Sequence, residues 1–311
     1  MLLGIPLFLL VGCYNENVQE LIPYEPYIAE VDTSELQYAY SFEKVKVYTG
    51  PTYQLETPAQ ELLTDATYIK QVYGELPFIE NEQDLADYLQ QQLSAYDLRI
   101  GIHYNSTSAP AAVIEDVFEN LMNGNDLISG ILLGYEYGLE KIEGGYFIDI
   151  NAMFTTNKIE LATVNQQMDA YMLELNLDGL SDYEKTKKIY EFVIEKMDYV
   201  STDLLKEHSI VGFVEGKGVC QAYAVAMNYL LERAGVPSRY IIGDIKADLV
   251  TDFTGHAWNM VKLEGQWYHL DATWDDDVEE WSYFLVSDEM MEQSRTWKKQ
   301  YYEQAEQNYK M

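Results

Sequence analysis

The sequence is poor in basic residues and in cysteine. Its 311 residues include 20 Lys and Arg against 52 Asp and Glu, which gives a formal net charge of -32, and only two residues are cysteines. A chain this negative repels nucleic acid and anionic membrane surfaces, so we expect neither as an electrostatic partner. Because 48% of the residues are hydrophobic, the chain can bury the core of a globular protein, and its length favours two domains.

The apolar run at the start of the chain is too short to cross a bilayer. Residues 2–11 form a run of about ten, whereas a membrane-spanning helix needs about twenty, and this length is typical of a secretory signal. The run ends in Leu10-Val11-Gly12-Cys13, which resembles the lipobox of bacterial lipoproteins, although no Lys or Arg precedes the run. We therefore expect residues 1–12 to be a signal peptide and Cys13 to carry a lipid that holds the protein on the outer side of the bacterial cell membrane. The alternative is an apolar N-terminal strand that ends in Gly-Cys by chance.

Two α+β domains are predicted after a polar tether at residues 13–35. The smaller first domain, residues 36–160, carries no motif that demands chemistry, and its His103 is expected to be an ordinary strand residue. The second domain, residues 161–311, opens with two helices, and Ser181 with Glu184 forms a capping-box signature at the second. Periodicity predicts strands at 42–48, 98–104, 132–137 and 146–154, helices at 82–95, 111–122, 163–175 and 181–197, and turns at Gly138 and Gly144-Gly145.

Cys220 is the single thiol left if Cys13 carries lipid, so it has no partner for an internal disulfide. It follows Gly216-Lys217-Gly218-Val219 and precedes an alanine-rich stretch with helical spacing that ends at Gly235. We therefore predict Cys220 at a helix N-terminus, where unpaired N–H groups and the helix dipole favour the thiolate. The glycines leave room over the sulfur, and the Cys220 amide is positioned to donate to an oxyanion. The alternative is a small buried hydrophobic residue.

A hairpin predicted near the end of the chain brings a histidine and an aspartate together. If Glu264-Gly265 is a two-residue loop between strands at 255–263 and 266–273, Asp271 lies opposite Trp258. His256 is then the diagonal neighbour of Asp271 on the same face, within side-chain reach. His269 shares this face, but it lies deeper in the strand, roughly opposite Met260, so we expect it to have a packing role.

These segments resemble the transglutaminase-like superfamily over about residues 160–285: a Cys at a helix start, then Gly255-His256-Ala257-Trp258, then Trp267-Tyr268-His269-Leu270-Asp271-Ala272-Thr273-Trp274. The resemblance implies a papain-like α+β fold with the nucleophile helix packed on an antiparallel sheet. It also implies Cys220 as nucleophile, His256 as general base and later acid, and Asp271 as the residue that orients His256. The implied reaction is acyl transfer from an amide of a protein or peptide, with cell-wall material among the candidates, to water or to an amine.

We expect no cofactor and no metal. The run Asp275-Asp276-Asp277, with Glu279 and Glu280, offers oxygen ligands that Ca²⁺ prefers, but it lacks the EF-hand spacing, so a solvated loop is the favoured interpretation. One mature cysteine and scattered histidines make no zinc cluster. The tryptophans Trp258, Trp267 and Trp274 are expected to pack around or shield the cleft.

Two other interpretations stay open. The second domain could be a catalytically inert papain-like scaffold in a cell-surface protein whose first domain binds a wall polymer or a protein. Alternatively, the first domain could be an inhibitory flap over the cleft. Comparing thiol reactivity with and without the first domain separates the flap from the other interpretations.

Overall fold

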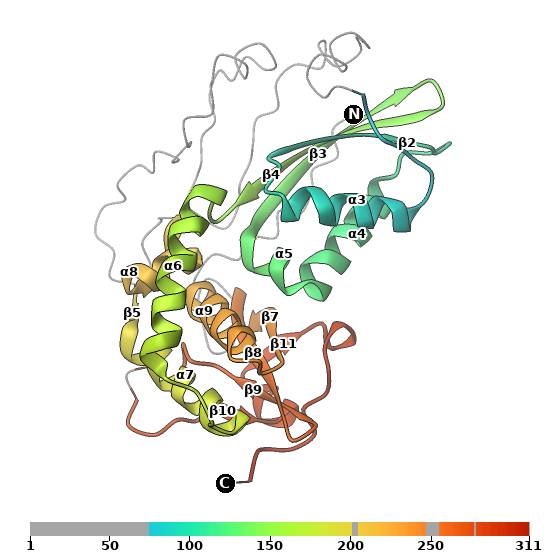
Figure 1. Ribbon diagram of the computed structural model, residues 1–311. Coiled ribbons are helices and arrows are strands. Elements are labelled where there is room, and N and C mark those ends of the chain that lie inside the picture. The colour runs from blue at the N-terminus through green and yellow to red at the C-terminus, as the bar shows by residue number, and fades with distance from the viewer. Residues whose placement is uncertain (1–74, 201–204, 247–254, 277, 311) are drawn as a thin grey trace, which may run out of the picture. The chain divides into compact units, whose positions relative to one another are not determined.

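The structure is a computed structural model that describes residues 75–200, 205–246, 255–276 and 278–310 (Figure 1). The predicted signal peptide, Cys13, the tether and the strand at 42–48 lie outside the described residues. The described chain divides into two compact units, one holding residues 75–117 and 134–152 and the other holding residues 118–133 and the rest from 153 onwards. The boundary that the sequence suggested at residue 160 falls inside helix α6 (Lys158–Leu175). Residues 118–133 and 153–160, which the sequence assigned to the first domain, belong to the second unit.

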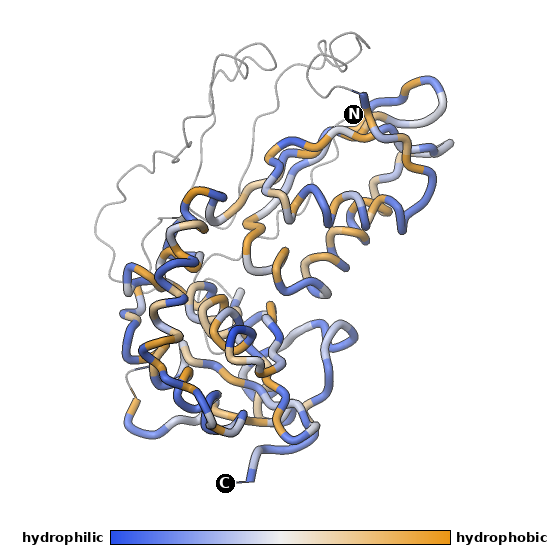
Figure 2. The backbone as a smooth tube through the Cα atoms, viewed as in Figure 1, coloured by the Kyte–Doolittle hydropathy of each residue, from blue (hydrophilic) through white to orange (hydrophobic). Residues whose placement is uncertain are grey.

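The first unit is built on a four-stranded sheet of order β1-β2-β4-β3. Strand β1 runs parallel to β2, and β2 runs antiparallel to β4. Every fourth position of helix α3, Leu85, Leu89 and Leu93, is fully buried, and α3 alternates between hydrophilic and hydrophobic stretches in Figure 2, as a helix with one buried face should. The elements are β1 (Phe78–Ile79), α3 (Glu82–Ser94), β2 (Arg99–Tyr104), α4 (Ala111–Gly124), β3 (Leu132–Ile142) and β4 (Gly145–Phe154), and the chain passes between the two units within α4, β3 and β4.

The predicted helices at 82–95 and 111–122 and the strands at 98–104, 132–137 and 146–154 are confirmed by α3, α4, β2, β3 and β4. The predicted turn at Gly138 is wrong. Strand β3 continues through this residue to Ile142, and the chain turns at Gly144, whose φ of +79° is open to glycine but strained for other residues.

The second unit packs helices on a five-stranded antiparallel sheet of order β10-β9-β8-β7-β11. Helix α9 lies against β7 and β8, so the predicted packing of this helix on an antiparallel sheet is confirmed. The capping box of Ser181 and Glu184 is present at the start of α7. The remaining elements are α5 (Asp126–Ile131), α6, α7 (Asp182–Lys196), β5 (Asp198–Tyr199), η2 (Leu205–His208), α8 (Ile210–Glu215), β6 (Lys217–Gly218), α9 (Cys220–Arg233), β7 (Ser238–Ile245), β8 (Gly255–Leu263), β9 (Gln266–Leu270), β10 (Phe284–Val286), α10 (Asp288–Met291), β11 (Arg295–Trp297) and η3 (Lys299–Tyr301).

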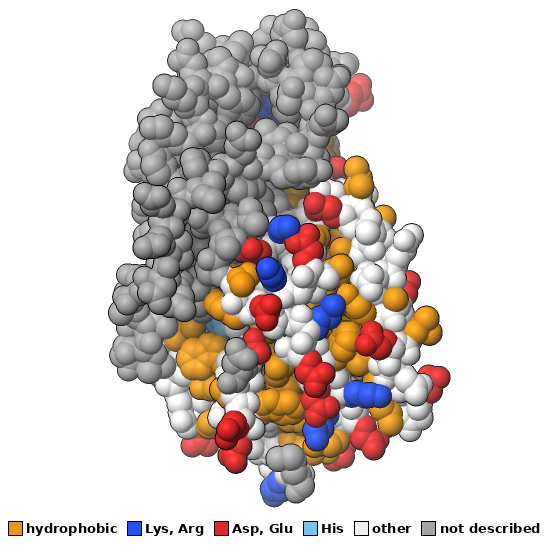
Figure 3. Space-filling view, turned by 90° about the vertical axis from the view of Figure 1, so that its left-hand side faces the viewer, with side chains coloured by type: hydrophobic (Ala, Val, Ile, Leu, Met, Phe, Trp, Pro, Cys, Tyr) orange, Lys and Arg blue, Asp and Glu red, His pale blue; other side chains and the backbone are white. Residues whose placement is uncertain are grey.

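The five-stranded sheet has a separate core on each face because side chains alternate along its strands. On one face Val261 and Leu270 belong to the main cluster, which includes residues of α7 and α9. On the other face Trp258 and Met260 pack with Ile241. Among the described helices none is long and apolar enough to cross a membrane. On the face of the molecule seen in Figure 3, acidic side chains are spread over the described surface with basic ones among them, and no basic patch gathers on that face.

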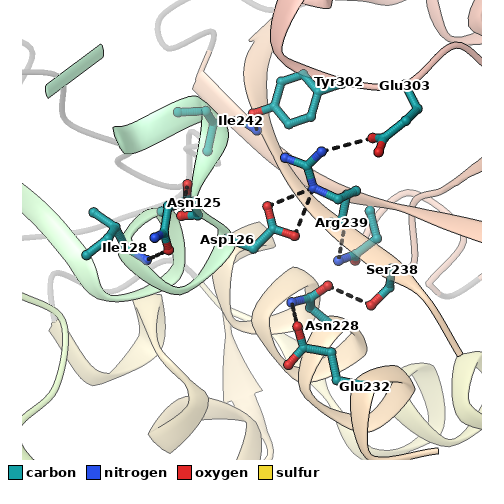
Figure 4. Close-up of polar contacts among 12 residues, drawn as sticks. Asn125, Asp126, Ile128, Asn228, Glu232, Ser238, Arg239, Ile242, Tyr302 and Glu303 are labelled. Carbon is teal, nitrogen blue, oxygen red and sulfur yellow. Dashed lines mark hydrogen bonds and ion pairs between the residues drawn. The ribbon is translucent and has the colours of Figure 1, made fainter. Parts of the chain in front are cut away.

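Helix α5 is fixed to strand β7 by an ion pair (Figure 4). The Nε of Arg239 lies 3.1 Å from both carboxylate oxygens of Asp126, and its Nη1 lies 2.9 Å from Glu303. Burial raises the pKa of the Asp126 carboxyl by more than Arg239 lowers it. Next to this pair, Ser238 donates to Asn228 at 2.8 Å and so connects β7 to α9. Residues 118–133 are therefore a structural part of the second unit, although they precede residues 134–152 of the first.

Candidate active site

Cys220 is the first residue of α9, as the sequence predicted, and 2% of its surface is exposed. The preceding N-cap residue, Val219, offers no side-chain cap to the helix. Gly218 is required at its position because a Cβ there would lie 2.6 Å from the Ala222 Cβ and 2.8 Å from the Glu207 carbonyl oxygen. The segment around Glu207 thus passes close to the start of α9. As the first residue of this helix, Cys220 lies at the positive end of the helix dipole.

The thiol packs beside the strand that carries His256. Cys220 forms a small buried cluster with Ala224, Tyr240 and Ala257, and Ala257 directly follows His256 in β8. The start of α9 and the start of β8 are thus brought to the same part of the second unit.

His256 and Asp271 are joined by a hydrogen bond of 2.7 Å between Nε2 and Oδ2, and both side chains are fully buried. The register that predicted this pairing is confirmed, since Leu263 pairs with Gln266 and Met260 with His269. Glu264 and Gly265 have φ values of +53° and +85°, as a two-residue type I′ loop requires. With Asp271 accepting from Nε2–H, the neutral ring has its acceptor lone pair on Nδ1, which is the arrangement a general base needs.

Arg295 is a residue of this site that sequence reasoning missed. Its buried guanidinium donates from Nη2 to Oδ2 of Asp271, and it packs on the rings of Trp274 and Tyr283, 4.0 and 4.2 Å from their centroids. Burial alone would raise the pKa of Asp271, but the charges of His256 and Arg295 and the hydrogen bonds from both lower it to about 2. No local motif marks Arg295, because it arrives from β11, on the far side of β7 in the sheet.

His269 has a structural role, as predicted. It is fully buried opposite Met260, its Nδ1 accepts from the Trp258 indole at 3.0 Å, and its Nε2 lies 2.9 Å from an oxygen of Asp288. Because an indole N–H can only donate, the Nδ1 of His269 carries no proton in this arrangement. Burial lowers the pKa of His269 by more than the Asp288 contact raises it. Protonation would break the indole bond, so His269 is unsuited to be the base.

The acidic run is not a solvated loop at its start, and that prediction was wrong for Asp275 and Asp276. Asp275 is 1% exposed, accepts from the Tyr190 hydroxyl at 2.7 Å, and accepts from the backbone N–H of Tyr283 at 3.0 Å. Asp276 accepts from the Tyr223 hydroxyl at 2.6 Å. Asp275 is therefore buried and Asp276 half-buried, and each accepts from a hydroxyl group of α7 or α9. Glu279 and Glu280 are exposed, Asp277 lies outside the described residues, and the part of the chain that the structure describes contains no cluster of three or more metal-ligating side chains.

The three predicted tryptophans differ in position. Trp258 is buried with its ring stacked 5.9 Å from that of His256, and Trp274 lies 6.1 Å from the same ring. Trp267 is only partly buried and packs at the edge of the Trp258 cluster. Trp258 and Trp274 therefore enclose the imidazole, while Trp267 is remote from it in the strand.

Comparisons with solved structures find weak likenesses. A putative cysteine protease from Cytophaga hutchinsonii is 14% identical over 46% of this chain and 65% of its own, with a TM-score of 0.30. A structure described as a TGase is 13% identical over 71% of this chain and 64% of its own, with a TM-score of 0.34. The periplasmic domain of TgpA from Pseudomonas aeruginosa is 19% identical over 42% of this chain and 55% of its own, with a TM-score of 0.28. The matched region thus spans about two thirds of the first two of these chains.

No curated protein is significantly similar to the chain in sequence. A family model does match: residues 171–272 fit that of the transglutaminase-like superfamily. The matched segment runs from the last part of α6 to just beyond β9 and includes Cys220, His256 and Asp271. The likeness to the transglutaminase-like superfamily therefore covers this segment, about a third of the chain.

Proposed function

We propose that this protein is a cysteine enzyme that transfers or hydrolyses acyl groups of protein or peptide amides. Cys220 is the nucleophile, His256 the general base and later acid, and Asp271 the residue that orients the imidazole. The observation that carries the proposal is the buried 2.7 Å hydrogen bond between His256 and Asp271. Ala257, the residue after His256, packs on Cys220 at the N-terminus of α9. A buried inert thiol needs neither feature.

The reaction proceeds in two balanced steps. The thiolate of Cys220 adds to the carbonyl carbon, the carbonyl electron pair moves to oxygen, and the resulting tetrahedral species expels an amine that takes a proton from His256. Water or a second amine then attacks the thioester, gives a proton to His256, and releases the thiol. Because the pKa of Asp271 is lowered to about 2, its carboxylate stays ionised at neutral pH and stabilises the imidazolium formed in each step. Water as acceptor makes the enzyme a peptidase or amidase, and an amine makes a cross-link.

The proposal includes a location outside the cytoplasm, with the protein attached to the bacterial cell membrane by a lipid on Cys13. The short apolar run followed by Leu10-Val11-Gly12-Cys13 supports it. Incorporation of radiolabelled palmitate into the wild-type protein but not into Cys13→Ala is the expected result, and equal incorporation would contradict the anchor.

Thiol alkylation tests the catalytic pair. An unactivated cysteine has a pKa of about 8.5 and reacts slowly with iodoacetamide at pH 6. We expect rapid labelling of the wild-type protein at pH 6 and loss of that reactivity in His256→Ala. The matched control is His103→Ala, a half-buried histidine of the first unit, which should label like the wild type.

Labelling that occurs only above pH 8, and equally in the wild type and His256→Ala, would instead support the inert scaffold. A panel of peptide amides, assayed with and without a primary amine, then distinguishes hydrolysis from cross-linking. Release of ammonia or peptide without incorporation of the amine identifies a hydrolase.

A further inference from the structure

Tyr240 is a buried residue close to the nucleophile. It lies in β7 opposite Asn259, and the side chains of such a pair share one face of the sheet. That face is the one toward α9, because the Asn259 side chain donates to the carbonyl of Ala224 at 2.9 Å. Tyr240 is 1% exposed and belongs to the small cluster that contains Cys220.

The hydroxyl of Tyr240 makes no hydrogen bond of normal geometry with any of the described residues. Buried polar groups without a partner are uncommon in folded proteins, and such a group calls for an explanation. The proposed reaction also needs a second hydrogen-bond donor for the oxyanion, because the Cys220 amide supplies only one.

The electrostatics of Tyr240 agree with a position beside the reacting sulfur. Burial raises the pKa of this phenol well above its usual value of about 10, and a negative charge on Cys220 raises it further, while the Gln221 carboxamide lowers it. The phenol is therefore protonated at neutral pH and can donate. The Gln221 carbonyl oxygen lies 2.5 Å from Nδ1 of His208, and this contact ties the first turn of α9 to η2.

We propose that the Tyr240 hydroxyl is the second oxyanion donor of this site, acting with the backbone N–H of Cys220. The inference rests on the proposed cysteine chemistry. When the thiolate adds to a carbonyl carbon, the new C–S bond forms as the carbonyl electron pair moves to oxygen, and the Tyr240 O–H turns about its C–O bond to donate to that oxygen. The proton stays on Tyr240, and the donor is released when the carbonyl re-forms and the leaving group departs.

Two reactions of the same sulfur separate this role from activation of the thiol. Iodoacetamide is attacked at a saturated carbon, so no oxyanion forms, whereas p-nitrophenyl acetate acylates the thiol through a tetrahedral oxyanion and releases p-nitrophenolate. In Tyr240→Phe we expect the alkylation rate constant to stay within about twofold of the wild-type value. The rate constant of the p-nitrophenolate burst should fall about 10²–10³-fold, the usual effect of deleting an oxyanion donor. Cys220→Ala supplies the background.

Tyr302→Phe is the matched control, because the Tyr302 hydroxyl already accepts from the N–H of Ile242 at 3.4 Å. This variant should leave the ratio of the two rate constants unchanged. An unchanged ratio in Tyr240→Phe overturns the inference but leaves the proposed function standing. A wild-type protein that shows neither reaction at neutral pH overturns the proposed function itself. Because no hydrogen bond of normal geometry holds the Tyr240 hydroxyl, Tyr240→Phe should fold and should unfold within a few degrees of the wild type, and a variant that does not fold also overturns the inference.

Discussion

The Asp271 carboxylate is shared between an imidazole and a guanidinium, all inside the protein. A buried carboxylate with no counter-charge is strongly unfavourable, so Arg295, together with His256, allows Asp271 to remain an anion. The guanidinium also packs on the rings of Trp274 and Tyr283, which are perpendicular to each other, and these contacts restrict the direction of its donor groups. The imidazole therefore lies against a carboxylate of fixed position and fixed charge.

This arrangement predicts a specific pH dependence of stability. The folded-state pKa of Asp271, about 2, lies below its usual value of 3.8. Its contribution is therefore present above pH 3.8 and is lost as the pH falls toward 2. We expect Asp271→Asn to be destabilised at pH 5, and its deficit relative to the wild type to shrink by about 2 kcal/mol between pH 4 and pH 2.

Urea unfolding followed by tryptophan fluorescence measures this difference, and titration of the other carboxyl groups cancels between the two proteins. Asp169→Asn is the control, because Asp169 lies on the surface with 71% of its side chain exposed. A deficit of Asp271→Asn that stays constant from pH 5 to pH 2 would show that the carboxylate is not stabilised by its neighbours.

Side-chain partners within one hairpin could be predicted, and partners from distant strands could not. The pairing of His256 with Asp271 followed from alternation and the loop length, both of which are local properties of the sequence. Arg295 and Tyr240 reach the site through β11 and β7, and their roles depend on what the sheet places against them. The buried state of Asp275 was missed for the same reason, since its partner Tyr190 lies in α7.

Helix α9 begins where it does because two segments pass close to Gly218. A methyl group there would lie 2.6 Å from the Ala222 Cβ and 2.8 Å from the carbonyl oxygen of Glu207. Gly218→Ala must therefore displace either the helix start or the segment before α8. We expect a loss of about 1–3 kcal/mol in the free energy of unfolding, as for other overpacked sites, together with slower alkylation of Cys220 at pH 6.

Gly138→Ala is the matched control for this experiment. Gly138 lies inside β3, and a Cβ there would meet no atom within 4 Å. Its stability and the alkylation rate of Cys220 should match the wild type. If Gly218→Ala also matched the wild type in both measurements, the close approach would not be what positions the nucleophile helix.

Helices and strands with strong local signals were the predictable elements. The capping box at Ser181 and the loop at Glu264 and Gly265 each satisfy backbone geometry with residues adjacent in the chain. Strand β3 continues through Gly138 to Ile142 because it pairs with the neighbouring strand β4, which the local sequence does not reveal. The division of residues 118–133 from 134–152 was beyond sequence reasoning, because it is set by which core each segment joins.

The second unit consists of two separate stretches of chain, and this has a measurable consequence. A fragment of residues 160–311 lacks α5, whose Asp126 pairs with Arg239 and whose Ile128 and Ile131 are buried. We expect the fragment to be less stable than the same unit in the full chain by at least about 3 kcal/mol, the order of two buried apolar side chains.

All five tryptophans lie between residues 258 and 297, so their fluorescence reports on the second unit in either protein. The urea midpoint of the fragment should be lower, and Asp126→Asn in the full chain should reproduce part of the shift. Equal midpoints for the fragment and the full chain would show that α5 adds nothing to this unit. The fragment also tests the inhibitory flap, because faster alkylation of its Cys220 would indicate that the missing residues shield the thiol.

Arg295 follows Asp271 by 24 positions and enters the sheet as part of β11, the outer neighbour of β7. A nascent polypeptide that ends at α10 already contains the sulfur, the imidazole and the carboxylate, yet it has no guanidinium to neutralise the carboxylate. A chain clipped after α10 is therefore expected to hold the Asp271 carboxylate less stably and, under the proposed function, to carry a less reactive thiol.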